Sequence, residues 1–450
     1  MFLRVKRHRI YFVMVVLVAV CLMAGSYYGR VGSAQPLAAP TWSSGFQIQN
    51  LDPANPATVN IIYRDQNGSV VHTQSGLSIP AGGSTTIFPL PVSGFDGSVE
   101  VQSDRPVAAI TNLLTSNPTM LDSYVGVTSP GTQAFLPLIM RDNSGYSTTV
   151  YIQNTGSAQA NVTLEYRRTG SPAVVKTRPL TIPVGGRATV RQFEDDADLG
   201  SRWVGSIRVS SDQPIATVVT QSNGSILFSY NGFSQGSQRM YLPLIMCGNS
   251  GWCTGLQAMN VGSAPTTITL KVDGVVRDTV SLGPYESKTW YPVPPGSPTR
   301  RHVGSAVLEA STGGQIVAIV NELNTGLNQG MSYVGFSGGT STVNLPLVMT
   351  NNNNYQVGVQ IQNLGPNDVN VRVRAVSSQD GSVARDDTVT VPGNGSKTLY
   401  PAVGAIPGPR FVGSMTVSGP PGSQLVAIAN QITYPQQPGD TSAVYNGFNQ

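Results

Sequence analysis

Charged residues are scarce in this chain of 450 residues, and so are the residues that most enzymes use for catalysis. Lys, Arg, Asp and Glu together make up 11% of the sequence, and there are only three histidines and three cysteines. Soluble domains usually carry roughly a quarter of charged residues. The sequence contains no His-Glu-x-x-His or phosphate-loop motif, and these motifs supply metal ligands and phosphate contacts. We therefore predict a protein that is not an enzyme and needs no cofactor.

The positive charge of the chain is concentrated at its N-terminus. The chain has 27 basic and 23 acidic residues. Residues 1–34 hold no acidic residue and five basic ones, which are Arg4, Lys6, Arg7, Arg9 and Arg30. The remaining chain has 22 basic against 23 acidic residues. A balanced charge of this kind does not indicate a nucleic-acid partner.

The N-terminal segment has the pattern of an export signal. A basic stretch over 1–9 precedes an apolar stretch over 10–24, which is shorter than the roughly 20 residues that a membrane-spanning helix needs. Small residues at Gly32, Ser33 and Ala34 predict cleavage after Ala34. If the segment is not cleaved, it would form an anchor helix, the only contact with a membrane that we expect. We predict an extracellular or cell-surface location.

The rest of the chain is an internal repeat. Leu-Pro-Leu recurs at Leu136, Leu242 and Leu345, and Gln35-Pro36-Leu37 is a shortened first version. Recurring asparagines stand at Asn50, Asn154, Asn260 and Asn363, and recurring tyrosines close each unit at Tyr124, Tyr230, Tyr333 and Tyr445. We divide the chain into a signal peptide over 1–34 and repeats over 35–134, 135–240, 241–343 and 344–450.

Each repeat has the length and the pattern of one β-sandwich. Runs rich in β-branched and apolar residues, such as Asn161–Tyr166, alternate with turns rich in glycine and proline. We predict four tandem immunoglobulin-like Greek-key β-sandwiches after an N-terminal signal or anchor helix. The connections are short, as at Ser234–Tyr241, so we expect a rod of four beads. We assign the recurring asparagines to hairpin turns and the closing tyrosines to buried positions with a hydrogen-bonded hydroxyl.

The stretch from Val150 to Leu164 carries a resemblance to a known group of domains. Its pattern is apolar-x-apolar-Gln-Asn-x-Gly followed by a short strand with alternating apolar residues. This pattern resembles the bacterial immunoglobulin-like repeats of cell-adhesion type, the CARDB-like group. The resemblance covers about 20 residues of each unit. It implies a surface or extracellular module and assigns no binding residue.

One aromatic residue stands eight positions before each recurring asparagine. These residues are Trp42, Tyr146, Trp252 and Tyr355. Because eight is an even number, the aromatic residue shares a strand face with the apolar side chains. This phase favours packing at the edge of a core or at a junction between repeats. Stacking on sugar rings remains the alternative.

Two other clusters have local explanations. Cys247 and Cys253 flank a short turn, and in an exported protein they are expected to form a disulfide. Acidic residues gather at Glu194, Asp195, Asp196 and Asp198. Their spacing fits no calcium-loop motif, so a solvated loop is favoured and a calcium site is the alternative. No other metal site is expected.

Two functions fit these observations. The first is a non-catalytic structural or adhesive surface protein, whose repeats associate with each other or with other surface proteins through exposed strands. The second is a surface protein that binds glycans through its repeated aromatic residues. The two differ in whether replacing those aromatic residues lowers stability or lowers binding.

Overall fold

The structure, a computed structural model, describes residues 10–14, 41–116, 119–293, 301–406 and 408–450. Nearly all regular elements are antiparallel strands, so the predicted class of tandem β-sandwiches is confirmed. The N-terminal helix is not confirmed: Ile10–Met14 form strand β1, and the rest of the signal segment, with the cleavage position, lies outside the described residues. Among the described residues, no helix is long and apolar enough to cross a membrane.

The strands fall into four sets that follow the repeats. Unit 1 contains β2 (Thr41–Asn50), β3 (Ala57–Asp65), β4 (Val70–Ile79), β5 (Ser84–Ile87), β6 (Gly97–Ser103), β7 (Val107–Ser116) and β8 (Met120–Val125). Unit 2 contains β9 (Gly131–Arg141), β10 (Ser147–Asn154), β11 (Ala160–Arg168), β12 (Val174–Ile182), β13 (Arg187–Arg191), helix α1 (Gln192–Asp195), the 3₁₀ turn η1 (Ala197–Leu199), β14 (Trp203–Ser222) and β15 (Leu227–Asn231).

The other two units repeat this arrangement. Unit 3 contains β16 (Arg239–Cys247), β17 (Trp252–Asn260), β18 (Thr266–Val272), β19 (Val275–Leu282), β20 (Ser287–Val293), β21 (His302–Ala310), β22 (Ile316–Asn324) and β23 (Gln329–Val334). Unit 4 contains β24 (Thr342–Thr350), β25 (Tyr355–Asn363), β26 (Val369–Ser377), β27 (Val383–Val391), β28 (Ser396–Leu399), β29 (Phe411–Ser418), β30 (Leu425–Thr433), β31 (Ala443–Asn446) and β32 (Phe448–Asn449).

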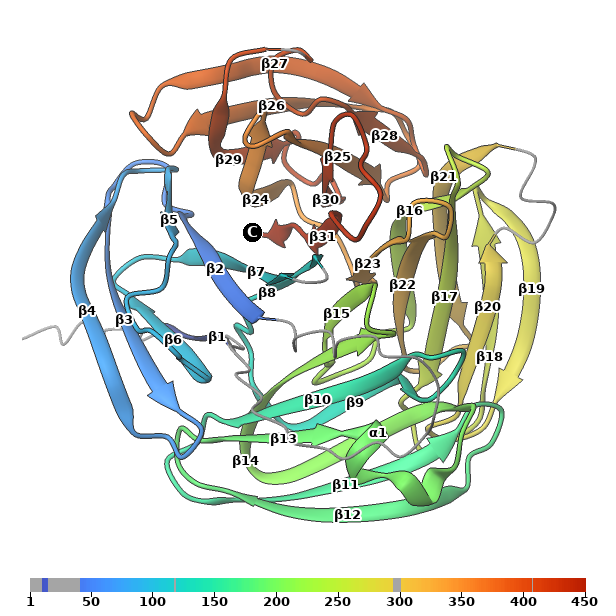
Figure 1. Cartoon of the computed structure of the whole chain (residues 1–450). Helices are drawn as coiled ribbons and strands as arrows, with labels where there is room; N and C mark the ends of the chain where they lie inside the picture. The colour runs from blue at the N-terminus through green and yellow to red at the C-terminus, as the bar shows by residue number, and fades with distance from the viewer. Residues whose placement is uncertain (1–9, 15–40, 117–118, 294–300, 407) are drawn as a thin grey trace, which may run out of the picture.

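Each unit packs two sheets face to face. In unit 3 one sheet has the order β16-β21-β18-β19 and the other β20-β17-β22-β23. We call the sheet that ends in the closing strand (β8, β15, β23 or β31) the inner sheet and the other the outer sheet. In unit 2 the two are joined, because β14 runs for 20 residues through both. The edge strands β4, β12, β19 and β27 form the perimeter of the molecule (Figure 1).

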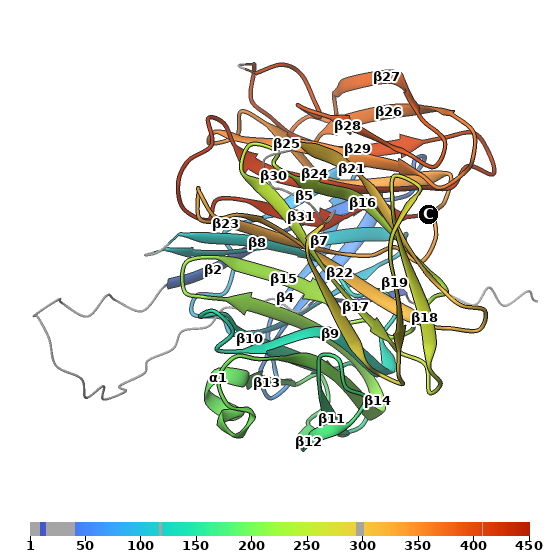
Figure 2. The same cartoon turned by 90° about the vertical axis from the view of Figure 1, so that its right-hand side faces the viewer.

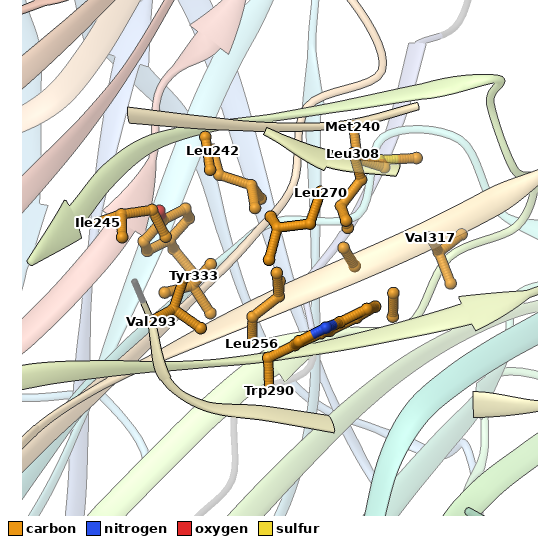
Figure 3. Close-up of a cluster of buried hydrophobic side chains, with 14 of the residues drawn as sticks. Met240, Leu242, Ile245, Leu256, Leu270, Trp290, Val293, Leu308, Val317 and Tyr333 are labelled. Atoms are coloured by element: carbon orange, nitrogen blue, oxygen red, sulfur yellow. The ribbon is translucent and has the colours of Figure 1, made fainter. Parts of the chain in front are cut away.

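Alternation of apolar and polar residues places one face of most strands in a core. In β18 every second residue from Thr266 to Val272 is buried, as expected for a strand that covers a core on one side. Figure 3 shows the result in unit 3, where Leu242, Leu256, Leu270 and Trp290 meet between the two sheets. The Leu-Pro-Leu strands differ, because nearly all their residues are buried.

The recurring asparagines build the turns that follow β2, β10, β17 and β25. The Asn154 side-chain amide donates hydrogen bonds to the carbonyl oxygens of Ala158 (2.7 Å) and Ile182 (3.0 Å), and its oxygen accepts one from Gly156 N–H (2.9 Å). Asn50, Asn260 and Asn363 make the equivalent bonds. These buried amides satisfy backbone groups that the turn leaves without partners, as predicted.

Three of the closing tyrosines bind the Leu-Pro-Leu strand through their hydroxyls. Tyr230, Tyr333 and Tyr445 donate to the second leucine of each motif, at distances of 2.7, 2.7 and 2.5 Å. The predicted buried hydroxyl bond is therefore confirmed in units 2, 3 and 4. Tyr124 of unit 1 is equally buried, but its hydroxyl makes no such bond to a Leu-Pro-Leu strand among the described residues and lies against the Thr111 hydroxyl instead.

The four units form a closed ring, so the expected rod is wrong. The closing strands β8, β15, β23 and β31 meet at the centre, each in contact with the next, and β31 of unit 4 contacts β8 of unit 1 (Figures 1 and 2). Each hydrophobic core takes in residues of a neighbour: Ile319 of unit 3 packs in the unit 2 core, and Ile110 of unit 1 packs in the unit 4 core. Short linkers limit the distance between neighbouring units but do not set the angle between them. The sequence alone therefore favoured a rod.

Polar side chains join the closing strands in pairs. The Asn231 side chain bonds both backbone groups of Val125 at 3.2 and 2.8 Å. Asn446 does the same to Val334 at 3.0 and 2.7 Å. Asparagine and valine occupy the same repeat position, so units 2 and 4 supply the asparagine while units 1 and 3 supply the backbone.

A second set of contacts repeats at the other strand of each junction. Asn321 donates to Gln221 (3.1 Å), and Asn430 donates to Glu322 (2.8 Å). Asn112 and Gln431 exchange two amide hydrogen bonds of 3.0 and 3.2 Å. This last pair links unit 1 with unit 4 and therefore closes the ring.

Buried carboxyl groups complete the centre of the ring. Asp440, in the loop before β31, accepts hydrogen bonds from the backbone of Leu227 (2.6 Å) and Gly330 (2.9 Å), so it joins unit 4 to units 2 and 3. Asp122 of unit 1 accepts from the backbone and hydroxyl of Ser229. Burial raises the pKa of Asp440 to about 8 and that of Glu322 to about 8, because a charged carboxylate loses its hydration there.

We predict that the chain scatters X-rays as a compact particle. A globular body of this length has a radius of gyration of about 22 Å, and an extended string of four units would roughly double that value. Small-angle scattering of the monomer at several concentrations measures it directly. A value near that of the extended string would contradict the ring.

We also predict that the ring is less stable at alkaline pH. The folded-state pKa values of Asp440 and Glu322 lie above their unfolded values of 3.8 and 4.5. Their contribution to stability is therefore full below about pH 4 and is lost as the pH rises towards 8. The melting temperature should fall between about pH 5 and pH 8, and D440N should flatten this fall. Glu194→Gln, at an exposed acid, should keep the wild-type slope; an unchanged slope in D440N would contradict the assignment.

Candidate binding grooves between the units

Three grooves lie at equivalent junctions, each between one unit and the next around the ring. They enclose about 290 Å³ between units 2 and 3, about 650 Å³ between units 3 and 4, and about 440 Å³ between units 4 and 1. Pockets for small ligands usually measure about 300–1,000 Å³. The repeat therefore creates three cavities of ligand size from one structural plan.

The first wall of each groove comes from the turn after a Leu-Pro-Leu strand. It carries an asparagine and, three residues later, the aromatic residue selected from the sequence. The pairs are Asn143 with Tyr146, Asn249 with Trp252, and Asn352 with Tyr355. Each asparagine amide lies against the sulfur of the methionine that is the next-to-last residue of the strand, at 3.4–3.6 Å.

The second wall comes from the next unit and carries an exposed aromatic ring. Tyr291, Tyr400 and Phe88 line the three grooves with 59%, 44% and 62% of their surface exposed. Each ring lies over a glycine of the adjacent strand, which is Gly255, Gly358 or Gly45. A Cβ atom at these glycines would come within 3.0–3.3 Å of the ring. One face of the ring is therefore supported by backbone while the ring remains largely exposed to the groove.

Polar groups stand beside each ring in fixed positions. A threonine two residues before the ring donates to a glutamine on the neighbouring strand, in the pairs Thr289–Gln257, Thr398–Gln360 and Thr86–Gln47. In two grooves an arginine also donates to the wall asparagine: Arg301 to Asn249 at 3.0 Å and Arg410 to Asn352 at 2.8 Å. The glutamines themselves are buried and bonded within the protein, so each groove offers an exposed aromatic face with an asparagine on the facing wall.

The junction between units 1 and 2 departs from this plan. At the position of the exposed ring unit 2 has Arg191, and at the position of the glycine it has Thr149. The chain then enters α1, which contacts β9, β10 and β13. Unit 2 thus has neither the ring nor the glycine beneath it, so we count three grooves of this kind.

The four aromatic residues selected from the sequence have different environments. Trp252 is buried, with 4% of its surface exposed, whereas Tyr146 and Tyr355 are half-buried. Burial raises the pKa of both tyrosines to about 12. Trp42 is half-buried against the unit 1 core. The structure therefore places three of them in three separate grooves and does not bring any two together.

Sequence reasoning missed the exposed rings. A signal was present, because Phe88, Tyr291 and Tyr400 each precede a proline and follow a threonine by two positions. An aromatic-proline pair also occurs in ordinary turns, and only the junction of two units gives these rings a common setting.

The two cysteines support a groove wall. Cys247 and Cys253 are joined by a disulfide that spans the turn carrying Asn249. This turn and Trp252 line the groove between units 3 and 4. The disulfide therefore restrains the wall of the largest of the three grooves, and it has no equivalent in units 2 and 4, where other residues stand at both positions.

The acidic cluster lies on α1 and η1 and is engaged by protein groups. Asp196 is buried and pairs with Lys176 (2.8 Å), Arg178 (2.5 Å) and the Tyr166 hydroxyl (2.9 Å). Asp198 pairs with Lys176, whose hydrogen bond lowers the pKa of that carboxyl. Asp195 accepts from Arg191 N–H, and Glu194 lies 3.6 Å from the Arg191 side chain. Within the described ranges, no group of three His, Cys, Asp or Glu residues is placed to hold a metal ion.

Comparisons with known proteins give little beyond the β-rich character of the chain. No family model and no curated protein matches the sequence. Among solved structures, the Thermotoga maritima protein 1070 is 18% identical, with 23% of this chain and 95% of that chain covered and a TM-score of 0.20. Latent PorU from Porphyromonas gingivalis is 11% identical, over 76% of this chain and 32% of that one, with a TM-score of 0.16. A four-repeat region of a large adhesion protein is 13% identical, over 91% and 95%, with a TM-score of 0.10. TM-scores this low carry no argument about function.

We predict that the two aromatic residues of one groove respond differently to truncation. W252A removes a buried ring and should lower the free energy of unfolding by about 3–5 kcal/mol. Y400A removes an exposed ring and should lower it by less than about 1 kcal/mol. Urea unfolding followed by far-UV circular dichroism measures both. Equal losses would show that both rings are only structural.

Proposed function

We propose that this protein is a non-catalytic adhesive protein that binds carbohydrate chains through its three inter-unit grooves. The observation that carries the proposal is the repeated exposed ring of Phe88, Tyr291 and Tyr400, each supported by a glycine. A single exposed ring needs no explanation, but these three recur at one position of the repeat, and each lines a groove.

The chemistry of the grooves suits a sugar. A pyranose presents an apolar C–H face and a rim of hydroxyl groups. The C–H face stacks on an aromatic ring, and hydroxyl groups bond to amides, which both donate and accept. Each groove holds an exposed ring on one wall and the amide of an asparagine on the other, which is Asn143, Asn249 or Asn352.

Three equivalent grooves in one rigid ring favour attachment to a polymer. Binding at one groove raises the effective concentration of the same chain at the next, so weak contacts add up to firm adhesion. An extracellular setting agrees with the N-terminal apolar segment and with the disulfide, since disulfides persist in oxidising compartments.

A glycan array followed by titration calorimetry tests the proposal. The wild-type chain should bind one class of polysaccharide. A triple variant with F88A, Y291A and Y400A should lose that binding and keep its melting temperature, because the removed rings are exposed. A single variant such as Y291A should weaken attachment to the polymer and leave the affinity for a short oligosaccharide at the other grooves unchanged.

Phe193 provides a matched control. Its ring is 49% exposed on α1, outside the three grooves, and lies over the Arg141 guanidinium. F193A should bind as the wild type does. Full binding by the triple variant would remove the grooves from the proposal, and absence of binding to every glycan would overturn it.

A second candidate, assembly into larger surface structures, has its own observation. Exposed valines begin the perimeter strands of all four units: Val70 and Val71, Val174 and Val175, Val275 and Val276, and Val383. Unpaired edge strands with apolar residues favour pairing between molecules, and charged residues oppose it. β4 contains no Lys, Arg, Asp or Glu, whereas β12, β19 and β27 do. Large particles in the scattering experiment described above would favour this candidate.

A further inference from the structure

The four units differ at one position of the turn that precedes β5, β13, β20 and β28. Two residues before each of these strands stands Gly82, Gly185, Tyr285 or Asn394, and all four have a positive φ, between 50° and 68°. The backbone of the turn is therefore alike in the four units while the side chain changes. In unit 3 a tyrosine adopts this left-handed conformation, which usually favours glycine.

The Tyr285 side chain fills a position against the outer sheet of unit 2. Its ring lies nearly parallel to that of Phe135, with 13° between the planes and 6.4 Å between the centroids. The guanidinium groups of Arg167 and Arg208 lie over the same ring, at 4.9 and 4.8 Å from its centroid. The Ser206 hydroxyl donates to the Tyr285 carbonyl oxygen at 3.4 Å. This junction is thus built around a six-membered ring.

The junction of units 4 and 1 has the same contact without the ring. The Ser414 hydroxyl, at the position of Ser206, donates to the Gly82 carbonyl oxygen at 3.1 Å. A Cβ atom at Gly82 would meet no atom within 4 Å. A cavity of about 370 Å³ lies there, between two turns of unit 1 and the outer sheet of unit 4, and it shares no lining residue with the groove at this junction. Glycine in place of tyrosine leaves this space open.

The wall that unit 4 gives to the cavity is polar. Strand pairing places Asn344 opposite Thr416, as it places Phe135 opposite Arg208 in unit 2. The Thr416 hydroxyl donates to the Asn344 side chain at 3.0 Å, and the Asn344 amide donates to the Gln450 side chain at 3.1 Å. Hydroxyl and amide groups suit the hydroxyl groups of a ligand better than they suit an aromatic ring.

Arg374 brings a positive charge to the same wall. It stands opposite Thr416 in the sheet. The equivalent residue of unit 2 is Glu165, opposite Arg208, and it forms ion pairs with Arg167 at 3.0 Å and with Arg208 at 3.7 Å. The sign of the charge at this position is therefore reversed where the cavity is open.

The acidic residues around the cavity are engaged elsewhere. Asp386 stands opposite Arg374 on β27, but its two carboxylate oxygens accept hydrogen bonds from Arg372, both at 2.6 Å. Asp52 of the facing turn accepts backbone N–H groups and pairs with an arginine of its own unit. Among the described residues, the Arg374 side chain forms no hydrogen bond and no ion pair. Its guanidinium can therefore receive a carboxylate through two parallel hydrogen bonds.

We propose that this cavity binds one acidic sugar residue, a uronic acid, with the carboxylate on Arg374 and the hydroxyl groups towards Thr416 and Asn344. A pyranose has about the breadth of the tyrosine ring that fills the equivalent position in unit 3, and the cavity lies within the size range of small-ligand sites. The inference does not depend on the three grooves.

Saturation-transfer NMR on the full chain tests the inference, because it detects weak ligands. The probes are glucuronate, glucose and inorganic sulfate, each added alone and titrated. We expect glucuronate to bind at least ten-fold more tightly than glucose, which lacks the carboxylate, and more tightly than sulfate, which lacks the ring.

Two variants at Gly82 form a matched pair. G82Y places in the cavity the side chain that unit 3 carries at this position, and it should abolish glucuronate binding. G82A imposes the same left-handed conformation on a residue with a Cβ atom, so the melting temperature should fall in both variants. The methyl group of G82A meets open space, and this variant should keep its glucuronate binding.

A second pair tests the charge. R374Q should weaken glucuronate binding about ten-fold or more and leave the response to glucose unchanged. Arg277 is an exposed arginine on β19 of unit 3, outside the cavity. R277Q should bind glucuronate as the wild type does.

Several outcomes would overturn the inference. Equal affinity for glucuronate and glucose would remove Arg374 from it, and equal affinity for sulfate would remove the sugar ring. Wild-type binding by G82Y would place the ligand outside the cavity, and absence of glucuronate binding would leave no site. The triple variant F88A, Y291A and Y400A should still bind glucuronate, so failure of this cavity and failure of the grooves are separate results.

Discussion

The meeting of the four closing strands at the centre of the ring is the contact on which the rest of the structure depends. Each unit is a sandwich of ordinary size, and nothing within a single unit creates a groove. The grooves exist because β8, β15, β23 and β31 hold neighbouring units at one fixed angle. Buried amides and carboxyl groups at this centre each have few suitable partners, so they permit few arrangements of the units.

The ring consists of four similar units, but one kind of contact occurs only at every second junction between them. The Asn231–Val125 and Asn446–Val334 contacts occur at alternate junctions, while the grooves occur at three junctions out of four. The junction between units 1 and 2 lacks the groove and is reinforced in another way: Arg187 forms an ion pair with Asp96 at 2.7 Å. Where the ring and its glycine are missing, the chain has helix α1 and this ion pair instead.

Much of the single unit was predictable from the sequence, and little of the assembly was. The repeated asparagine, the closing tyrosine and the period of the strands follow from local chemistry, and the structure places them as turns, buried hydroxyls and sheets. The ring depends on side chains such as Asn112 and Gln431, which are 319 residues apart and ordinary in composition. The sequence also pointed to one wall of each groove through Tyr146, Trp252 and Tyr355. It did not single out the opposite wall, because the aromatic-proline pairs of that wall gain a common setting only where two units meet.

Closure through Asn112 and Gln431 has a consequence for the synthesis of the chain. The chain emerges from its N-terminus, so unit 1 is complete long before its partner in unit 4 exists. Until then, Ile110 lacks the unit 4 core in which it packs. Before unit 4 is made, the first three units cannot close the ring. An apolar surface of unit 1 therefore stays in contact with solvent, which favours aggregation. The low content of charged residues adds to this tendency, because few charges oppose association of the exposed surface.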